Sequence, residues 1–132
     1  MSSQRNDERA VVHVVEPQQL FASALAEVFA EAGLTIDYVS VAIDARRTLD
    51  DRPDLIFLDT DFLPEPLESI RLVRMLAPRA IIGAYASEGS GSLKPSYAAA
   101  GADIVIEKSA DRRSIVQGLR EMEHLRRRRR VR

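Results

Sequence analysis

Three acidic side chains and one lysine closely follow short apolar runs that are typical of buried strands: Asp59 and Asp61, Glu16, and Lys108. In an open parallel sheet, the carboxyl ends of the strands meet along one edge, and ligands bind beyond that edge. We therefore expect three carboxylates and one ammonium group to lie close together there.

This combination of groups is suited to phosphoryl transfer onto a carboxylate. An aspartate can act as a nucleophile and form an aspartyl-phosphate. Grouped carboxylates repel one another, and Mg²⁺, which prefers oxygen ligands, relieves that repulsion. A lysine ammonium can pair with the carboxylate before the reaction and with the phosphoryl oxygens after it.

The elements that must position these groups alternate along the chain between buried strands and amphipathic helices. The predicted strands cover residues 11–15, 35–39, 55–58, 80–85 and 104–106, and the predicted helices cover 18–32, 40–49, 67–76, 94–100 and the segment from 111 onward. In the second helix, Ser40 is the expected N-cap, with Val41, Ala45 and Leu49 on the apolar face. Apolar strands joined by helices predict an α/β fold, a five-stranded parallel sheet with helices on both faces.

Composition narrows the possible functions. The 132 residues suit a single domain, and 45% hydrophobic with 30% charged residues is typical of a soluble globular protein. The absence of cysteine excludes disulfides, thiolate metal sites and cysteine nucleophiles. No apolar run is long enough to span a bilayer, and the polar start does not resemble a signal peptide, so we expect a cytoplasmic protein without membrane contact.

The order of elements and two motifs resemble the receiver domains of bacterial response regulators in two-component signalling. The run Leu-Ile-Phe-Leu-Asp that ends at Asp59 resembles the third strand of that family with its phosphoacceptor. The stretch Ala-Ala-Gly-Ala-Asp over 99–103 resembles the approach to the fifth strand, and Lys108 falls at the position of the family's lysine. The resemblance spans residues 11–122 and implies the flavodoxin-like strand order 2-1-3-4-5.

The resemblance also implies roles for the residues at the strand ends. Asp59 would accept the phosphoryl group with Lys108 as its partner, and Glu16, Asp59 and Asp61 would hold Mg²⁺. Such a protein is a signalling phosphoacceptor rather than an enzyme, and its partner would be a sensor histidine kinase or another signalling protein. The fourth helix, fifth strand and fifth helix would form the output surface and a possible homodimer contact.

Several positions depart from the family's pattern. Pro17 stands where a second acidic metal ligand is usual, which makes Mg²⁺ binding weak or absent, and Tyr85 stands where a threonine or serine hydroxyl is usual. Val105 replaces the switch aromatic, Ser109 replaces a proline, and the loop before Pro64 is one residue longer. The chain is therefore similar to an atypical receiver. The alternative is a pseudo-receiver that binds proteins independently of phosphorylation.

The charge is divided unevenly along the chain. Six of the 19 basic residues are arginines at 126–130 and 132, which leaves 13 bases against 20 acids in residues 1–125. We expect an N-terminal extension over 1–9, a receiver-like domain over 10–124, and an arginine-rich tail over 125–132. The tail has three interpretations: a solvated extension of the last helix, a nonspecific contact to nucleic-acid phosphates, or the start of a linker.

Overall fold

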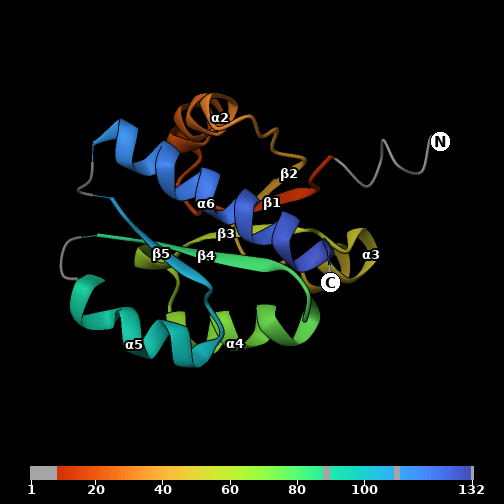
Figure 1. Ribbon diagram of the computed structural model, residues 1–132. Coiled ribbons are helices and arrows are strands. Elements are labelled where there is room, and N and C mark those ends of the chain that lie inside the picture. The colour runs from red at the N-terminus through yellow and green to blue at the C-terminus, as the bar shows by residue number, and fades with distance from the viewer. Residues whose placement is uncertain (1–8, 88–89, 109–110, 132) are drawn as a thin grey trace.

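The sheet contains five parallel strands in the order β2-β1-β3-β4-β5, which confirms the predicted α/β architecture and its 2-1-3-4-5 order. The computed structural model describes residues 9–87, 90–108 and 111–131. The strands are β1 (Val12–Val15), β2 (Tyr38–Ser40), β3 (Leu55–Asp59), β4 (Ile81–Ala86) and β5 (Ile104–Glu107). Figure 1 shows β2 at one edge of the sheet and β5 at the other.

Helices cover both faces of this sheet (Figure 1). The helical segments are η1 (Gln19–Phe21), α2 (Ala22–Glu31), α3 (Ala45–Asp51), η2 (Thr60–Phe62), α4 (Pro66–Leu76), α5 (Ser90–Ala100) and α6 (Arg112–Val131). Helices α2 and α6 pack side by side on one face, while α3, α4 and α5 cover the other. Each strand is joined to the next by a connection that contains a helix, and all pairs are parallel. The carboxyl ends of all five strands therefore lie at the same edge of the sheet.

The central strand β3 shows why the sheet is buried on both faces. All five of its residues are buried, and its side chains alternate between the two layers of the core. Leu55 and Phe57 pack among side chains of α2 and α6, whereas Ile56 and Leu58 pack among those of α4 and α5. A strand with no polar alternation must be covered on both sides. The packing on both faces fixes the position of β3, and Asp59 is its last residue.

Two glycines act through packing or backbone conformation. Gly83 on β4 leaves room for the side chain of Met122, since a Cβ at this position would lie 2.6 Å from the Met122 sulfur. Gly101 has φ of 127°, a conformation that favours glycine, and it directly follows α5, which ends at Ala100 as predicted.

The second helix begins later than predicted. Helix α3 starts at Ala45, and the Asp44 carboxylate caps it by accepting a hydrogen bond from the Arg47 N–H at 3.0 Å. The expectation that Ser40 caps this helix was wrong, because Ser40 ends β2 and its carbonyl accepts the Glu16 N–H at 2.9 Å. The predicted apolar face was also wrong.

In α3, Thr48 is the buried side chain, while Val41 and Leu49 are both more than half exposed. The buried Thr48 hydroxyl is satisfied because it donates a hydrogen bond to the Asp44 carbonyl at 2.8 Å. The predicted face failed because Val41 lies before the helix and Thr48, rather than Ala45 or Leu49, is the α3 side chain turned toward the core.

Most of the arginine run belongs to α6, which extends to Val131. Arg126 is only 4% exposed and makes two hydrogen bonds to the Glu123 carboxylate. Arg129 pairs with Asp103 at 3.1 Å and also donates to the Ala80 carbonyl. Arg129 therefore fastens the last turns of α6 to the body of the domain, whereas the Arg126 pair lies within the helix itself.

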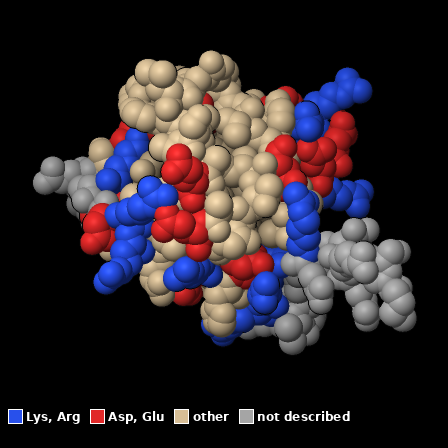
Figure 2. Space-filling view, turned by 90° about the horizontal axis from the view of Figure 1, so that it is seen from above, with Lys and Arg blue, Asp and Glu red and all other residues tan. Residues whose placement is uncertain are grey.

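The outer surface over α2 and α6 carries charges of both signs. Figure 2 views the molecule from this side. It shows a continuous uncharged area with charged side chains on both sides of it. Among the described residues, no helix has the length and apolar character that a membrane crossing requires.

Candidate functional site

Asp59 lies at the carboxyl end of β3, between β1 and β4. Its side chain is only 1% exposed. The Oδ1 atom lies 2.6 Å from the Lys108 ammonium nitrogen and also accepts the Asp61 N–H at 3.2 Å. The other oxygen, Oδ2, is buried and has no hydrogen-bond partner among the described residues.

Lys108 follows β5, and its backbone N–H donates to the Ala86 carbonyl at 2.7 Å. This bond belongs to the last pair of the β4–β5 ladder, Ala86 with Glu107, and places Lys108 at the carboxyl edge of the sheet. The ammonium group bridges Asp59 at 2.6 Å and Asp61 at 3.0 Å. Burial alone would lower the pKa of Lys108, but its hydrogen bonds to the two aspartates more than offset this effect and raise the pKa above the usual value.

Glu16 directly follows β1 and is buried. Its Oε2 accepts the Gln18 N–H at 3.0 Å, and its Oε1 has no hydrogen-bond donor within the described chain. Burial, followed by the hydrogen bond that a protonated Glu16 makes to the Asp59 carboxylate, raises the pKa of Glu16 to about 7. Two neighbouring carboxyl groups thus each present an unsatisfied oxygen, and a proton or a cation between them would satisfy both.

Asp61 completes the cluster from η2. Its Oδ1 accepts the Ser87 N–H at 3.1 Å, and its Oδ2 pairs with Lys108. Burial would raise the pKa of Asp61, but the Ser87 N–H and the Lys108 ammonium hold it below its ordinary value. Asp61 therefore ties β4 and β5 to the loop after β3.

The fit of Mg²⁺ to this cluster rests on the orphaned oxygens. Mg²⁺ in proteins is commonly held by one or two carboxylates, with water and phosphate oxygens completing the octahedron. Glu16 and Asp59 fit that pattern, since each has a buried oxygen without a partner. Pro17 offers no side-chain ligand, and the Asp61 carboxylate already binds Lys108 and Ser87. Within the described part of the chain, no group of three or more His, Cys, Asp or Glu side chains is arranged around a common metal position.

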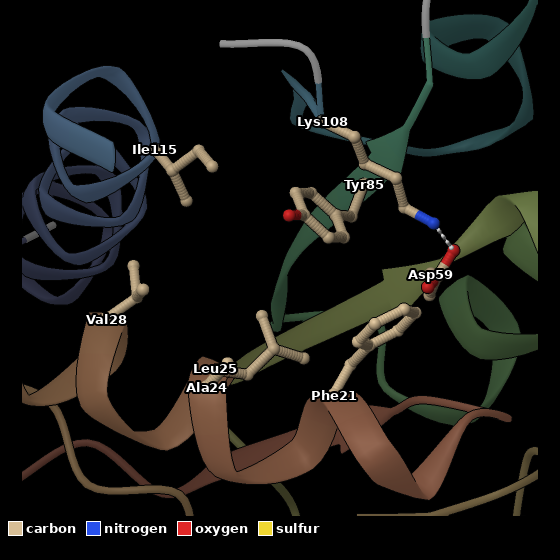
Figure 3. Close-up of a pocket in the computed structure, with 8 residues that line it drawn as sticks. All are labelled: Phe21, Ala24, Leu25, Val28, Asp59, Tyr85, Lys108 and Ile115. Atoms are coloured by element: carbon tan, nitrogen blue, oxygen red, sulfur yellow. Dashed lines mark ion pairs between the residues drawn. The ribbon is translucent and has the colours of Figure 1, made fainter. Parts of the chain in front are cut away.

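Tyr85 lies on β4 directly opposite Asp59 in the ladder. Its half-buried ring packs on Phe57, with ring centroids 4.9 Å apart. Burial raises the pKa of the Tyr85 phenol. Figure 3 shows the Tyr85 hydroxyl directed away from Asp59, so this hydroxyl does not take the place of the threonine or serine hydroxyl of typical receivers.

An apolar pocket of about 220 Å³ opens beside the acidic cluster. Figure 3 shows Asp59 and Lys108 at one end of it and Val28 and Ile115 at the other, with the Tyr85 ring on one side. The opposite side is formed by Phe21 from η1 and by Leu25 from α2.

The four charged residues predicted from the sequence are thus brought together: Glu16, Asp59, Asp61 and Lys108. Sequence reasoning missed Thr60, whose hydroxyl donates to the Tyr85 carbonyl at 3.1 Å and accepts from the Tyr97 hydroxyl at 3.4 Å. It also missed the wall formed by Phe21. Neither residue belongs to a motif, and the one weak signal was the position of Thr60 between Asp59 and Asp61.

The sequence matches no protein-family model and no curated protein. Solved structures do match its fold. A two-component response regulator of the LuxR family from Aurantimonas sp. SI85-9A1 has a TM-score of 0.75 at 20% identity, covering 88% of this chain and 86% of that one. A response regulator from Thermotoga maritima has a TM-score of 0.74 at 20% identity, covering 88% and 98%.

A pilus assembly-related protein from Burkholderia pseudomallei K96243 is also similar, with a TM-score of 0.73 at 16% identity over 89% of this chain and 91% of that one. Likeness at these identities establishes a shared architecture, and proteins with this architecture carry different functions. The strand order, the helical layers and the structural matches together show that this chain has the fold of response regulator receiver domains.

Proposed function

We propose that this chain is a signalling receiver that accepts a phosphoryl group on Asp59. The observation that carries the proposal is the ion pair between Lys108 and Asp59 at 2.6 Å, at the carboxyl edge of the sheet beside Glu16. A nucleophilic carboxylate, a cation that can follow its charge and a second acid are the groups that phosphoryl transfer to aspartate requires.

In this proposal the Asp59 Oδ2 attacks the phosphorus atom of the donor. It is the oxygen without a hydrogen-bond partner, whereas Lys108 and the Asp61 N–H hold Oδ1 and fix the orientation of the carboxylate. The new P–O bond forms as the P–N bond of a phosphohistidine or the P–O bond of an acyl phosphate breaks. The imidazole takes up a proton or the carboxylate departs, and Lys108 remains to pair with the phosphoryl oxygens.

Mg²⁺, when bound, would neutralise charge between the carboxylates and the phosphoryl oxygens. Glu16 and Asp59 are the residues that would hold it. The Glu16 carboxyl must lose its proton before it can act as a ligand, so the raised pKa of Glu16 weakens metal binding at low pH.

A route for the signal runs from this site to α5. Asp59 and Thr60 are consecutive, and the Thr60 hydroxyl connects the Tyr85 carbonyl to the Tyr97 hydroxyl. A phosphoryl group on Asp59 adds negative charge at the start of this chain of bonds. The proposed output surface is α5, β5 and α6, which would contact another signalling protein or a second copy of this chain.

The second candidate is a pseudo-receiver that binds proteins without phosphorylation. The nearly complete burial of Asp59 favours this alternative, together with Tyr85 across the ladder and Pro17 in place of a ligand. In that case Lys108 and Asp59 form a permanent structural ion pair.

Intact-mass measurement after incubation with acetyl phosphate and Mg²⁺ separates the two candidates. The proposal expects the mass of one phosphoryl group on the wild-type chain and none on Asp59→Asn. Asp50→Asn is the matched control, because Asp50 is an exposed carboxylate on α3, and it should label like the wild type. An unlabelled wild type, under conditions that label an ordinary receiver, favours the pseudo-receiver.

A further inference from the structure

The apolar pocket beside Asp59 is larger than phosphoryl chemistry needs. Its volume of about 220 Å³ exceeds the roughly 150 Å³ of an engineered cavity that binds benzene. The walls that Phe21, Leu25, Val28 and Ile115 contribute are apolar, so they offer nothing to a phosphate or to a metal ion. They suit an apolar body about the size of one aromatic ring.

The polar end of the pocket needs a hydrogen-bond donor rather than an apolar group. Asp59 lines this end, and its buried Oδ2 has no hydrogen-bond donor among the described residues whenever Glu16 is ionised. Lys108 does not meet this need, because its ammonium already pairs with Asp59 Oδ1 and with Asp61. A hydrogen-bond donor supplied by a ligand would satisfy the remaining oxygen.

The charge at this end is negative in excess. Even with a proton on Glu16, the two aspartates Asp59 and Asp61 outweigh the single ammonium of Lys108. The rings of Phe21 and Tyr85 face the pocket from its two sides, as Figure 3 shows, and aromatic faces attract cations. A cationic head is therefore favoured both by the carboxylates and by the rings.

We infer that this pocket binds a small apolar organic ammonium ion, with its ammonium at Asp59 and its apolar body between Phe21, Leu25 and Tyr85. An organic anion would face the excess carboxylates, and a neutral apolar molecule would leave Asp59 Oδ2 unsatisfied. A bare metal ion would use only the carboxylates. The inference rests on the proposed function in that it concerns the same aspartate, and it assigns the large side chain of Tyr85 a role as a wall.

The probe is 2-phenylethylamine, titrated into the ¹⁵N-labelled chain without Mg²⁺ at pH 8, where Glu16 is mostly ionised, and followed by NMR. Its neutral and anionic counterparts, 2-phenylethanol and phenylacetate, have a similar apolar body. We expect saturable shifts at η1, α2 and β4, with the amine binding about tenfold more tightly than the alcohol, since a hydrogen bond to a charged group accounts for a difference of this order. Phenylacetate should bind most weakly.

Two pairs of variants locate the site. Ala24→Trp fills the pocket from the surface of α2, whereas Ala30→Trp places the same side chain on the outer face of that helix, so only the first should abolish amine binding. Asp59→Asn should weaken amine binding about tenfold and leave alcohol binding nearly unchanged. Retained amine binding in Ala24→Trp, or amine binding that Asp59→Asn leaves unaltered, would overturn the inference.

Acetyl phosphate labelling of the same wild-type sample keeps this test separate from that of the proposed function. Labelling without saturable amine binding contradicts the pocket inference alone. Amine binding without labelling supports the pocket inference and contradicts phosphoryl acceptance alone. Tighter binding of phenylacetate than of the amine would show that Lys108 dominates the pocket, which also overturns the inference.

Discussion

Tyr85 lies directly opposite Asp59 in the β3–β4 ladder, and its ring packs on Phe57 with its hydroxyl directed away from the carboxylate. The β4 residue in register with Asp59 thus contributes an aromatic wall rather than a hydroxyl donor. The same ring bounds the apolar pocket beside Asp59, whose side chain is only 1% exposed.

Tyr85→Thr should therefore speed the labelling of Asp59 by acetyl phosphate. Removing the ring opens a path to the carboxylate and places a hydroxyl on that side of the sheet, so we expect an increase of about tenfold in the initial rate. Loss of the packing on Phe57 should lower the free energy of unfolding by about 2–4 kcal/mol. Intact mass over time and urea unfolding measure the two effects.

Tyr85→Phe is the matched control for that prediction. It keeps the ring and removes a hydroxyl that has no contact with Asp59, so labelling should stay at the wild-type rate. An equal acceleration in both variants would show that the phenol rather than the ring limits the reaction.

Pro17→Asp should strengthen Mg²⁺ binding. The new carboxylate follows Glu16 directly and supplies a further oxygen beside the orphaned oxygens of Glu16 and Asp59. We expect the dissociation constant for Mg²⁺ to fall about tenfold in isothermal titration at pH 8. Pro78→Asp adds the same charge in an exposed loop between α4 and β4 and should leave Mg²⁺ affinity unchanged. Equal gains in both variants would indicate a general charge effect.

The charged cluster was predictable because strand ends are easy to recognise. The apolar run before Asp59 identified a buried strand, and parallel topology then brought Glu16, Asp61 and Lys108 to the same edge without any knowledge of side-chain geometry. A bulky Tyr85 ring over the acidic pocket could be expected from the sequence, but its packing on Phe57 and the direction of its hydroxyl became visible only in the structure.

The surface helices were less predictable. The start of α3 depended on whether Ser40 or Asp44 capped it, and the β1–β2 ladder decided this by holding Ser40 in the sheet. The arginine run gave no signal of its tertiary partners either. The roles of Arg126 and Arg129 depend on Glu123, Asp103 and the backbone of Ala80, and two of these lie far away in the sequence.

Glu16→Gln should change the pH dependence of stability. Since the pKa of Glu16 is raised from 4.5 to about 7 on folding, the unfolded chain ionises first, and the wild type loses stability as pH rises from about 4.5 to about 7. The Gln variant lacks this loss, and its amide can donate to Asp59 Oδ2. Its free energy of unfolding relative to the wild type should therefore increase by about 1–2 kcal/mol over that interval, given that water reaches the adjacent pocket.

Urea unfolding from pH 4 to pH 8, with a chelator present to remove divalent cations, measures this difference. Glu27→Gln is the control, because Glu27 lies exposed on α2, and its stability should run parallel to that of the wild type. A constant offset between Glu16→Gln and the wild type across the whole range would contradict the coupling of Glu16 to folding.

Asp103→Ala should loosen the far end of α6. The Asp103 carboxylate pairs with Arg74 at 2.7 Å and Arg129 at 3.1 Å, and it accepts the Ile82 N–H at 2.8 Å. Its removal deprives two arginines and a part-buried N–H of their acceptor, so we expect a loss of about 1–3 kcal/mol in the free energy of unfolding. Faster amide hydrogen exchange should follow in the last turns of α6, while the labelling of Asp59 at the opposite end of the sheet stays unchanged.

The control is Asp50→Ala, which removes only the exposed pair with Arg46 at 3.9 Å and should lower the free energy of unfolding by less than about 0.5 kcal/mol. Equal losses in the two variants would show that Asp103 does not anchor the helix.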